Sequence, residues 1–325
     1  MKNSEFRNRR RQGFLDQDSC GSTIAQLEVE TGRPLGPSLS QEDLCRNLRA
    51  RAFDSWVIFK LKYTAGESLT ELANSLDHVV ASYELYVEAL DELPDSQYHP
   101  PFIMNDLIDT YVRYLNIVSV AILLRREDLI ERICALNEGT DFDGVDAVLE
   151  ELFKFFLPDR PELDHWLWDK PYRKLLDAID SDTPEEMRTE MKRYVKNWYA
   201  DMKGQAHFWG QHEKIKPEFT PYDGYWAMCA AAFTYLYDID DSAYRNGTVY
   251  PKDLLDYARS IPRYDAQETM TKPLRVAGGE LCPKSGLWFT PAKTDSQAHF
   301  AAGTVMPDLP DAQYGLTIWQ WLRGQ

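Results

Sequence analysis

Apolar residues recur at helical spacing through most of this chain. The clearest stripe steps by three or four residues over 69–90, which aligns one apolar face along several helical turns. A second pattern over 103–122 becomes apolar on all sides in its later half, which predicts a central, buried helix. Shorter helical patterns cover 127–137 and 144–157. The pattern therefore favours a helical protein.

Two helix starts are marked by capping residues. Ser40 is suited to cap a helix that runs to about Lys62, because a serine oxygen can accept a free N–H of the first turn. Thr183 begins a capping box, with Pro184 in the first helical position and Glu186 three residues after the threonine. We therefore expect helices to begin at both places.

The pattern of apolar residues, Gly and Pro changes in the last third of the chain. A small, apolar run over 224–233 predicts a helix with close neighbours, an acidic turn follows at 238–242, and Pro251 opens another helix. After Pro273 short apolar runs are separated by Gly and Pro, which is typical of small strands and turns. We expect Trp288, Trp319 and Trp321 to seat this part on the helices.

Consecutive helices with short connections predict a mainly α fold, an array of antiparallel helical pairs with a small β-rich C-terminal appendage. Residues before Ser40 mix Arg, Gly, Ser and Pro without sustained periodicity, and prolines gather near Pro158 and Pro161. The expected organisation is a flexible arm over 1–39, an N-terminal helical domain over 40–160, a C-terminal helical domain over 161–270 and a small β-rich module over 271–325.

Negative charge is concentrated in one segment. Residues 63–270 carry 20 Lys and Arg against 40 Asp and Glu, whereas 1–62 have a net charge of +3 and 271–325 of +1. A field of this sign repels nucleic acid and anionic membranes, and it accelerates encounter with a basic protein surface. The other interpretation is that acidic surfaces simply keep a protein soluble. The charge favours a basic partner and argues against DNA binding.

The sequence also indicates the cellular compartment in which we expect the protein. No apolar stretch follows Arg9–Arg11, so we expect no secretory signal, and the longest apolar run is far below the roughly 20 residues of a membrane helix. The arginines could bind anions or form a solvated segment that offsets nearby acids. Five scattered cysteines show no zinc or disulfide spacing and are expected to be buried thiols. A cytoplasmic protein is the natural expectation.

Candidate catalytic chemistry is sparse. His207 and His212 lie five residues apart, about 140° around a helix, without the HExxH pattern of a zinc site. No GxSxG nucleophile motif or phosphate-binding loop is present, and Asp164 beside His165 lacks a nucleophile. We therefore expect no enzyme activity, no cofactor and no metal. A metal-dependent hydrolase that uses the acidic turn with His207 or His212 is kept as an alternative.

Two acidic clusters are the candidate contact residues. Carboxylates between helices can cap the chain, hold a hard cation or present charge to Lys and Arg of another protein. The turn over 238–242 lacks the Gly and terminal Glu of a calcium loop, so capping of at least one aspartate and partner contact by the others is favoured. The predicted partner-binding residues are Asp238, Asp240, Asp241, Asp141, Asp143 and Asp146.

The order of motifs in the last helical part resembles a known family. The run Tyr222–Trp226, the small-residue helix, Asp238–Ser242 and Tyr250–Arg259 resemble the C-terminal helical domain of PoNi-type immunity proteins, over about Glu218–Arg263. Residues 40–160 resemble that family's N-terminal helical domain in general character. The family neutralises polymorphic nuclease effectors delivered between competing bacteria.

The C-terminal part extends beyond that two-domain pattern. Its motifs look like a C-terminal module of other immunity proteins found beside type VI secretion effectors: Cys282–Trp288, Gly303–Pro307, Tyr314-Gly315 and Trp319–Trp321. The resemblances imply an antitoxin that binds one cognate toxin domain, with a nuclease as the expected toxin. A helical adaptor protein with another partner is a further alternative.

Overall fold

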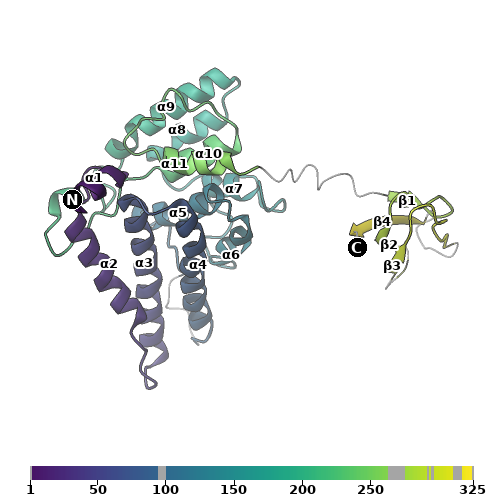
Figure 1. The fold of residues 1–325 in the computed structure, drawn as a ribbon, viewed down its shortest axis with the longest axis horizontal. Coiled ribbons are helices and arrows are strands. Elements are labelled where there is room, and N and C mark those ends of the chain that lie inside the picture. The colour runs from purple at the N-terminus through teal and green to yellow at the C-terminus, as the bar shows by residue number, and fades with distance from the viewer. Residues whose placement is uncertain are drawn as a thin grey trace. The chain divides into compact units, whose positions relative to one another are not determined.

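The computed structural model describes residues 2–93, 100–262, 275–290, 293, 296–309 and 317–323. The chain divides into two compact units, Met1–Ile261 and Pro262–Gln325, each with its own hydrophobic core (Figure 1). The first unit is helical and the second contains strands, so the mainly α fold with a small β-rich appendage is confirmed. The expected boundary at 270/271 lies outside the described residues.

The helical unit is built from α-helices joined mostly by short turns. Figure 1 shows α3 beside α4 and α8 beside α9, as antiparallel neighbours. None of the helices in the described part of the chain combines the length and apolar character that a bilayer crossing requires. The helices are α1 Lys2–Arg9, α2 Gln17–Gly32, α3 Gln41–Ala65, α4 Leu69–Asp91, α5 Ile108–Leu123, α6 Ile130–Ala135, α7 Ala147–Phe153, α8 Asp169–Ile179, α9 Pro184–Asp201, α10 Met228–Leu236 and α11 Lys252–Ser260, with short 3-10 turns at Glu127–Leu129 and Gln211–Lys214.

Side-chain caps begin helices α3, α4 and α9. Ser40 accepts from the Asp43 N–H at 3.1 Å before α3, and Ser68 accepts from the Glu71 N–H at 3.2 Å before α4. Thr183 caps α9 in the predicted capping box. The turn between α3 and α4 requires Gly66, whose φ is 93° and whose Cβ position lies 2.2 Å from the Arg9 carbonyl oxygen. The predicted starts at Ser40 and Thr183 are confirmed.

The core of the helical unit centres on α5. From Tyr114 to Leu123 every residue of α5 is buried, and α10 and α11 pack against this helix. The small residues Ala230, Ala231 and Ala232 of α10 allow that close approach and are themselves fully buried. The predicted central helix is therefore confirmed.

The N-terminal segment is not the flexible arm that we expected. Gln12 is 3 % exposed, and its amide donates to the carbonyls of Tyr225 at 2.7 Å and Thr248 at 2.9 Å. Arg11 pairs with Asp253 and lies over the Tyr63 ring at 4.4 Å. The prediction was wrong because contacts distant in sequence, and not local periodicity, hold this segment. Arg11 therefore has partners within the protein and is not only solvated.

The two predicted helical domains share one core. Leu15 of the N-terminal segment, Val118 of α5, Trp198 of α9 and Phe233 of α10 belong to the same buried cluster. Residues on both sides of position 160 thus fold as one compact unit. A separation at that position is a feature of the sequence pattern and not of the packing.

The second unit contains a four-stranded antiparallel sheet in the order β1-β4-β2-β3. Its strands are β1 Arg275–Ala277, β2 Gly286–Phe289, β3 Ala298–Phe300 and β4 Ile318–Arg323. Trp288 and Trp319, which we expected to seat this part on the helices, are buried within the unit's own small core. The side chain of Trp321 and the Tyr314-Gly315 motif lie outside the described residues.

Candidate partner-binding surface

The six predicted aspartates fall into two classes. Asp141, Asp238 and Asp240 are exposed. Asp143 is half-buried, and Asp146 and Asp241 are buried with 1 % and 5 % of their surface accessible. Exposure decides which of them can contact another protein. The structure therefore separates residues that the sequence placed together.

Asp241 holds the segment between α10 and α11. Its carboxylate lies 2.9 Å from Arg245 and 3.0 Å from Arg259, and Arg259 also donates to the Ile239 carbonyl at 2.8 Å. A carboxylate that is already paired twice inside the protein cannot reach a partner without breaking those pairs. We therefore assign Asp241 to the fold.

Asp146 and Asp143 are also held internally. Asp146 caps α7 by accepting from the Leu149 N–H at 3.1 Å, and it also accepts from Tyr111 and the Leu167 N–H. Burial raises the pKa of Asp146, while these hydrogen bonds oppose the rise. Asp143 pairs with Arg160 at 2.8 Å. Both residues stabilise the loop before α7.

Asp238 and Asp240 are presented to solvent by the same turn. Asp238 has a φ of 52°, in the left-handed region that aspartate tolerates better than most residues. Asp240 accepts from the backbone N–H of Ser242 at 3.0 Å, which with the Ser242 hydroxyl and Arg188 holds its pKa below the ordinary value. Asp240 therefore caps the turn, as the sequence favoured for one of these aspartates, and remains charged.

These two aspartates belong to a larger acidic surface. One hollow of about 530 Å³ lies where the turn before α9 meets the turn after α10. A second hollow of about 450 Å³ lies between α7, α8 and the loop that joins them. We call the exposed and half-buried carboxylates of both hollows the α8–α9 acidic surface; they are Glu151, Glu162, Asp164, Asp177, Asp180, Asp182, Glu185, Asp238 and Asp240.

Several of these carboxylates have no internal partner. Asp177, Asp180, Asp182 and Asp238 make no side-chain hydrogen bond or ion pair with any residue that the structure describes. Asp177 and Asp180 lie at the C-terminal end of α8, next to the negative end of the helix dipole. This placement is unfavourable for the isolated fold. It is consistent with a surface that meets positive charge on another molecule.

An exposed aromatic side chain adjoins this surface. Phe155 is 43 % exposed, and its ring contacts that of Tyr237 in an edge-on arrangement at 5.3 Å. The Tyr237 hydroxyl donates to Glu151, whose carboxylate also pairs with Lys154 at 2.6 Å. Burial raises the pKa of Glu151, and the charges of Asp180 and Glu162 contribute to this rise. An exposed apolar ring thus lies next to the acidic side chains.

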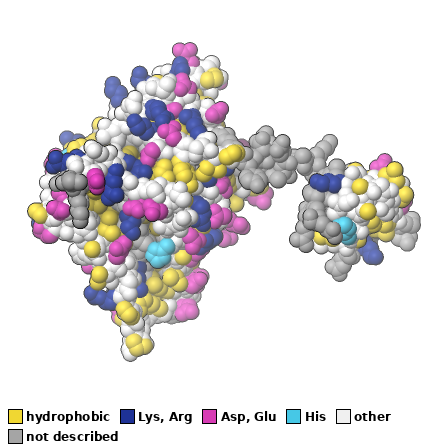
Figure 2. Space-filling view, viewed as in Figure 1, with side chains coloured by type: hydrophobic (Ala, Val, Ile, Leu, Met, Phe, Trp, Pro, Cys, Tyr) yellow, Lys and Arg dark blue, Asp and Glu magenta, His cyan; other side chains and the backbone are white. Residues whose placement is uncertain are grey.

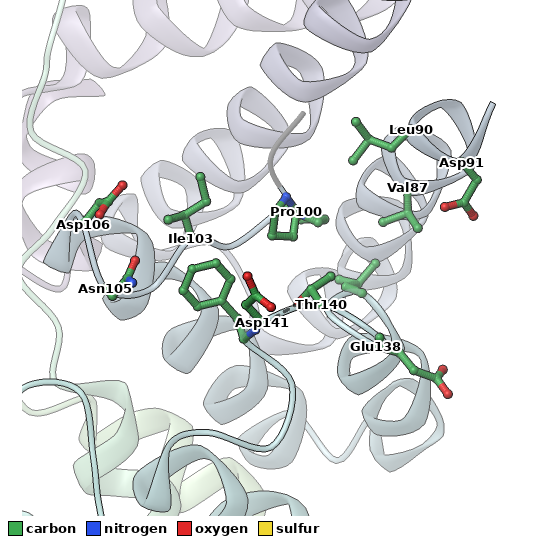
Figure 3. Close-up of a pocket in the computed structure, with 14 residues that line it drawn as sticks. Val87, Leu90, Asp91, Pro100, Ile103, Asn105, Asp106, Glu138, Thr140 and Asp141 are labelled. Atoms are coloured by element: carbon green, nitrogen blue, oxygen red, sulfur yellow. Dashed lines mark hydrogen bonds between the residues drawn. The ribbon is translucent and has the colours of Figure 1, made fainter. Parts of the chain in front are cut away.

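Asp141 lies in a separate acidic hollow of about 590 Å³ (Figure 3). Four carboxylates line it without any Lys or Arg among the lining residues, namely Asp91, Asp106, Glu138 and Asp141. Figure 3 shows Asp141 near Pro100, with Asp91 and Glu138 on one side of the view and Asp106 on the other. This Asp141 hollow is a second concentration of negative charge.

The negative charge does not form a uniform cover. On the face shown in Figure 2, acidic and basic side chains are interspersed over the helical unit. Many carboxylates are paired internally; Arg132, for example, pairs with Asp77 and Glu84 at 2.6 Å each. On α9 the exposed residues include Lys192, Arg193 and Lys196. The acidity is therefore local, and it is concentrated in the α8–α9 acidic surface and the Asp141 hollow.

The structure does not bring the residues of the hydrolase alternative together. His212 lies 2.8 Å from the Tyr225 hydroxyl, and His207 is near Asp109. Among the described residues, no group of three or more His, Cys, Asp and Glu side chains is arranged to hold a metal ion. Neither histidine is among the residues that line the hollow at the acidic turn.

The sequence indicated only part of the α8–α9 acidic surface. Phe155, Asp177, Asp180 and Asp182 were not predicted, because the sequence does not show that these residues lie close to the distant turn over 238–242. One signal was available. Two acids without a base in the last turn of a helix depart from the usual charge preference at that end.

Comparison with known proteins gives three results. Residues 144–254, which include the α8–α9 acidic surface, match the family model described as PoNe immunity proteins (PoNi), C-terminal. This confirms the resemblance to PoNi-type immunity proteins. No curated protein matches the chain. Among solved structures, protein PA2201 from Pseudomonas aeruginosa is similar in fold, with 20 % identity, a TM-score of 0.63 and coverage of 79 % of this chain and 95 % of that chain.

Proposed function

We propose that this chain, which carries the C-terminal region of the PoNi immunity proteins, binds a cognate bacterial toxin and neutralises it without catalysis of its own. The observation that carries the proposal is the family match over residues 144–254. The same residues build the α8–α9 acidic surface. The proposed contact surface and the family region therefore coincide.

The surface has the features of an interface for a basic protein. Unpaired carboxylates at Asp180, Asp182 and Asp238 would attract Lys and Arg side chains and accelerate encounter. Phe155, with Tyr237 behind it, would supply the apolar contact that is excluded from water on binding. Charge would then mainly set the association rate, and the contact made by Phe155 would mainly set the dissociation rate.

We further propose that the toxin is a nuclease with a basic active face. A protein that binds a phosphate backbone needs Lys and Arg along its substrate groove. An acidic surface would compete for those side chains and block the groove. The setting would be the cytoplasm of a cell exposed to interbacterial toxins, including effectors of a type VI secretion system.

A pair of charge-reversal variants tests the contact surface. Asp180→Lys with Asp182→Lys changes two exposed carboxylates that have no partner among the described residues and lie outside the left-handed region of φ, so the fold should persist. We expect this double variant to bind the toxin domain encoded beside the chain at least about tenfold more slowly, and to protect cells less well.

The matched control changes the Asp141 hollow by the same net charge. Glu138→Lys with Asp141→Lys should leave both the association rate and the protection close to those of the native chain. Equal losses in the two double variants would show that net charge alone matters. Losses confined to the control would place the contact at the Asp141 hollow.

A further inference from the structure

A cleft of about 390 Å³ lies outside both acidic regions, between α2, α3, α5 and the segment 207–223. All of its lining residues belong to the helical unit. The volume is within the usual range of ligand pockets. We call it the aromatic cleft, because Phe53, Trp56, Phe208 and Phe219 line it.

Two large aromatic side chains at the cleft remain accessible. Phe53 is 41 % exposed and Phe219 is 42 % exposed, while Trp56 is 2 % exposed and lies deeper. The Arg113 guanidinium lies over the Phe53 ring at 4.3 Å, which helps to fix that ring. An apolar side chain that entered between these rings would bury surface on both sides.

An amide side chain that lines the cleft has no partner among the described residues. Asn116 lies in the apolar helix α5, is 3 % exposed and makes no hydrogen bond to any described residue. Ser119, less than one turn further along, is also buried but donates to the Leu115 carbonyl at 2.6 Å. The Asn116 amide is not among the wholly buried side-chain groups without a partner in the described part of the chain, so it reaches the surface of the cleft. Its donor and acceptor are therefore available to a ligand in the cleft.

Charged groups of both signs are available beside Asn116. Arg113 pairs with no carboxylate, and Asp54 makes no hydrogen bond or ion pair, within the part of the chain that the structure describes. Lys60 is neutralised by Asp223 at 2.8 Å. A carbonyl oxygen suits Arg113, an N–H suits Asp54, and both suit an asparagine amide. A peptide group carries this combination of donor and acceptor.

We infer that the aromatic cleft binds a peptide segment and takes up one apolar side chain of about the size of phenylalanine or leucine. The side chain lies between Phe53 and Phe219, and Asn116 pairs with the adjoining peptide group. This binding site is independent of the acidic surface, because its recognition rests on aromatic contact and hydrogen bonds. It gives the protein a second way to hold a polypeptide.

The test uses the full-length chain and two small probes. N-acetyl-phenylalaninamide carries an aromatic ring and two amide groups, whereas 2-phenylethanol keeps the ring and lacks the amides. NMR titration of the labelled protein should show saturable binding of the amide probe with a Kd of about 1 mM, at least about fivefold tighter than the alcohol. The shifted signals should come from residues of the cleft.

Two variants separate binding from folding. Asn116→Leu replaces the amide with an apolar side chain of similar branching that can fill part of the cleft, so it should retain or raise the melting temperature. It should weaken binding of the amide probe about tenfold and leave binding of the alcohol unchanged. Phe53→Ala should weaken both probes. The inference is overturned if neither probe saturates the cleft, or if Asn116→Leu leaves the preference for the amide intact.

Discussion

At the residue scale, neighbouring aspartates have opposite roles. Asp240 is exposed and caps its own turn, whereas Asp241 faces inward and joins Arg245 to Arg259. The chemistry of the two side chains is identical. Burial and pairing decide that one is available to a partner and the other is not.

Replacement of Asp241 tests this distinction. Asp241→Asn would leave two arginines without their shared carboxylate at a site where the side chain is 7 % exposed. We expect a loss of about 2–4 kcal/mol in the free energy of unfolding. Urea denaturation measures it, with Asp240→Ala as the control. A native unfolding midpoint in Asp241→Asn would contradict the assignment.

The sequence identified acidic candidates but not their environment. Asp146 and Asp141 belong to the same short run, yet Asp146 caps α7 and Asp141 lines a hollow. Spacing along the chain indicates which residues are close in sequence. It does not indicate which carboxylates an arginine from elsewhere, such as Arg160, will neutralise.

At the element scale, the best predictions came from local signals. The capping box at Thr183 and the apolar stripe of α4 both depend on residues within one helix, and both appear in the structure. Helix α2 was missed, because few of its residues are buried and long-range contacts fix the N-terminal segment. Gln12 makes the clearest of these contacts.

Gln12 should therefore stabilise the N-terminal segment strongly. Its side chain bonds to the backbone of Tyr225 and Thr248 and accepts from the Tyr222 hydroxyl. Gln12→Ala would leave several buried groups unpaired. We expect the free energy of unfolding to fall by about 3 kcal/mol. Gln26→Ala is the matched control in α2, where the amide bonds only to Glu30 on the surface. Equal unfolding curves for the two variants would restore the flexible-arm interpretation.

At the scale of the whole molecule, two separate cores predict two separate unfolding events. Cys20, Cys45, Cys134 and Cys229 are buried in the helical unit, and Cys282 is buried in the sheet unit. Burial raises the pKa of Cys20 and Cys134 to about 11 and that of Cys229 to about 12. Because these pKa values lie above that of an exposed thiol, the reactive thiolate is scarcer in the folded state, and labelling reports unfolding.

Thiol labelling at about pH 8 in increasing urea measures both events. We expect Cys282 to become reactive at a midpoint different from that of the other four cysteines. A chain truncated after Ile261 should keep the midpoint of those four, because its core is complete without the sheet unit. A single midpoint for all five cysteines, or failure of the truncated chain to fold, would contradict independent units.

The net charge of the molecule acts through its local distribution. The segment 63–270 has twice as many acids as bases, yet internal pairs neutralise many of them and the α8–α9 acidic surface keeps several without a partner among the described residues. Charge segregation was therefore readable from the sequence. The surface that displays it was not, because that surface is assembled from α7, α8, α9 and the turn after α10.

The most direct test of the acidic surface is the rate at which the full-length chain associates with its cognate toxin domain as the salt concentration rises. In stopped-flow measurements from about 20 mM to about 500 mM NaCl, where screening becomes strong, the rate should fall about tenfold or more. The Asp180→Lys, Asp182→Lys variant should lose most of this dependence. An association rate that is indifferent to salt in the native chain, or a salt dependence unchanged in that variant, would contradict an acidic surface as the site of toxin recognition.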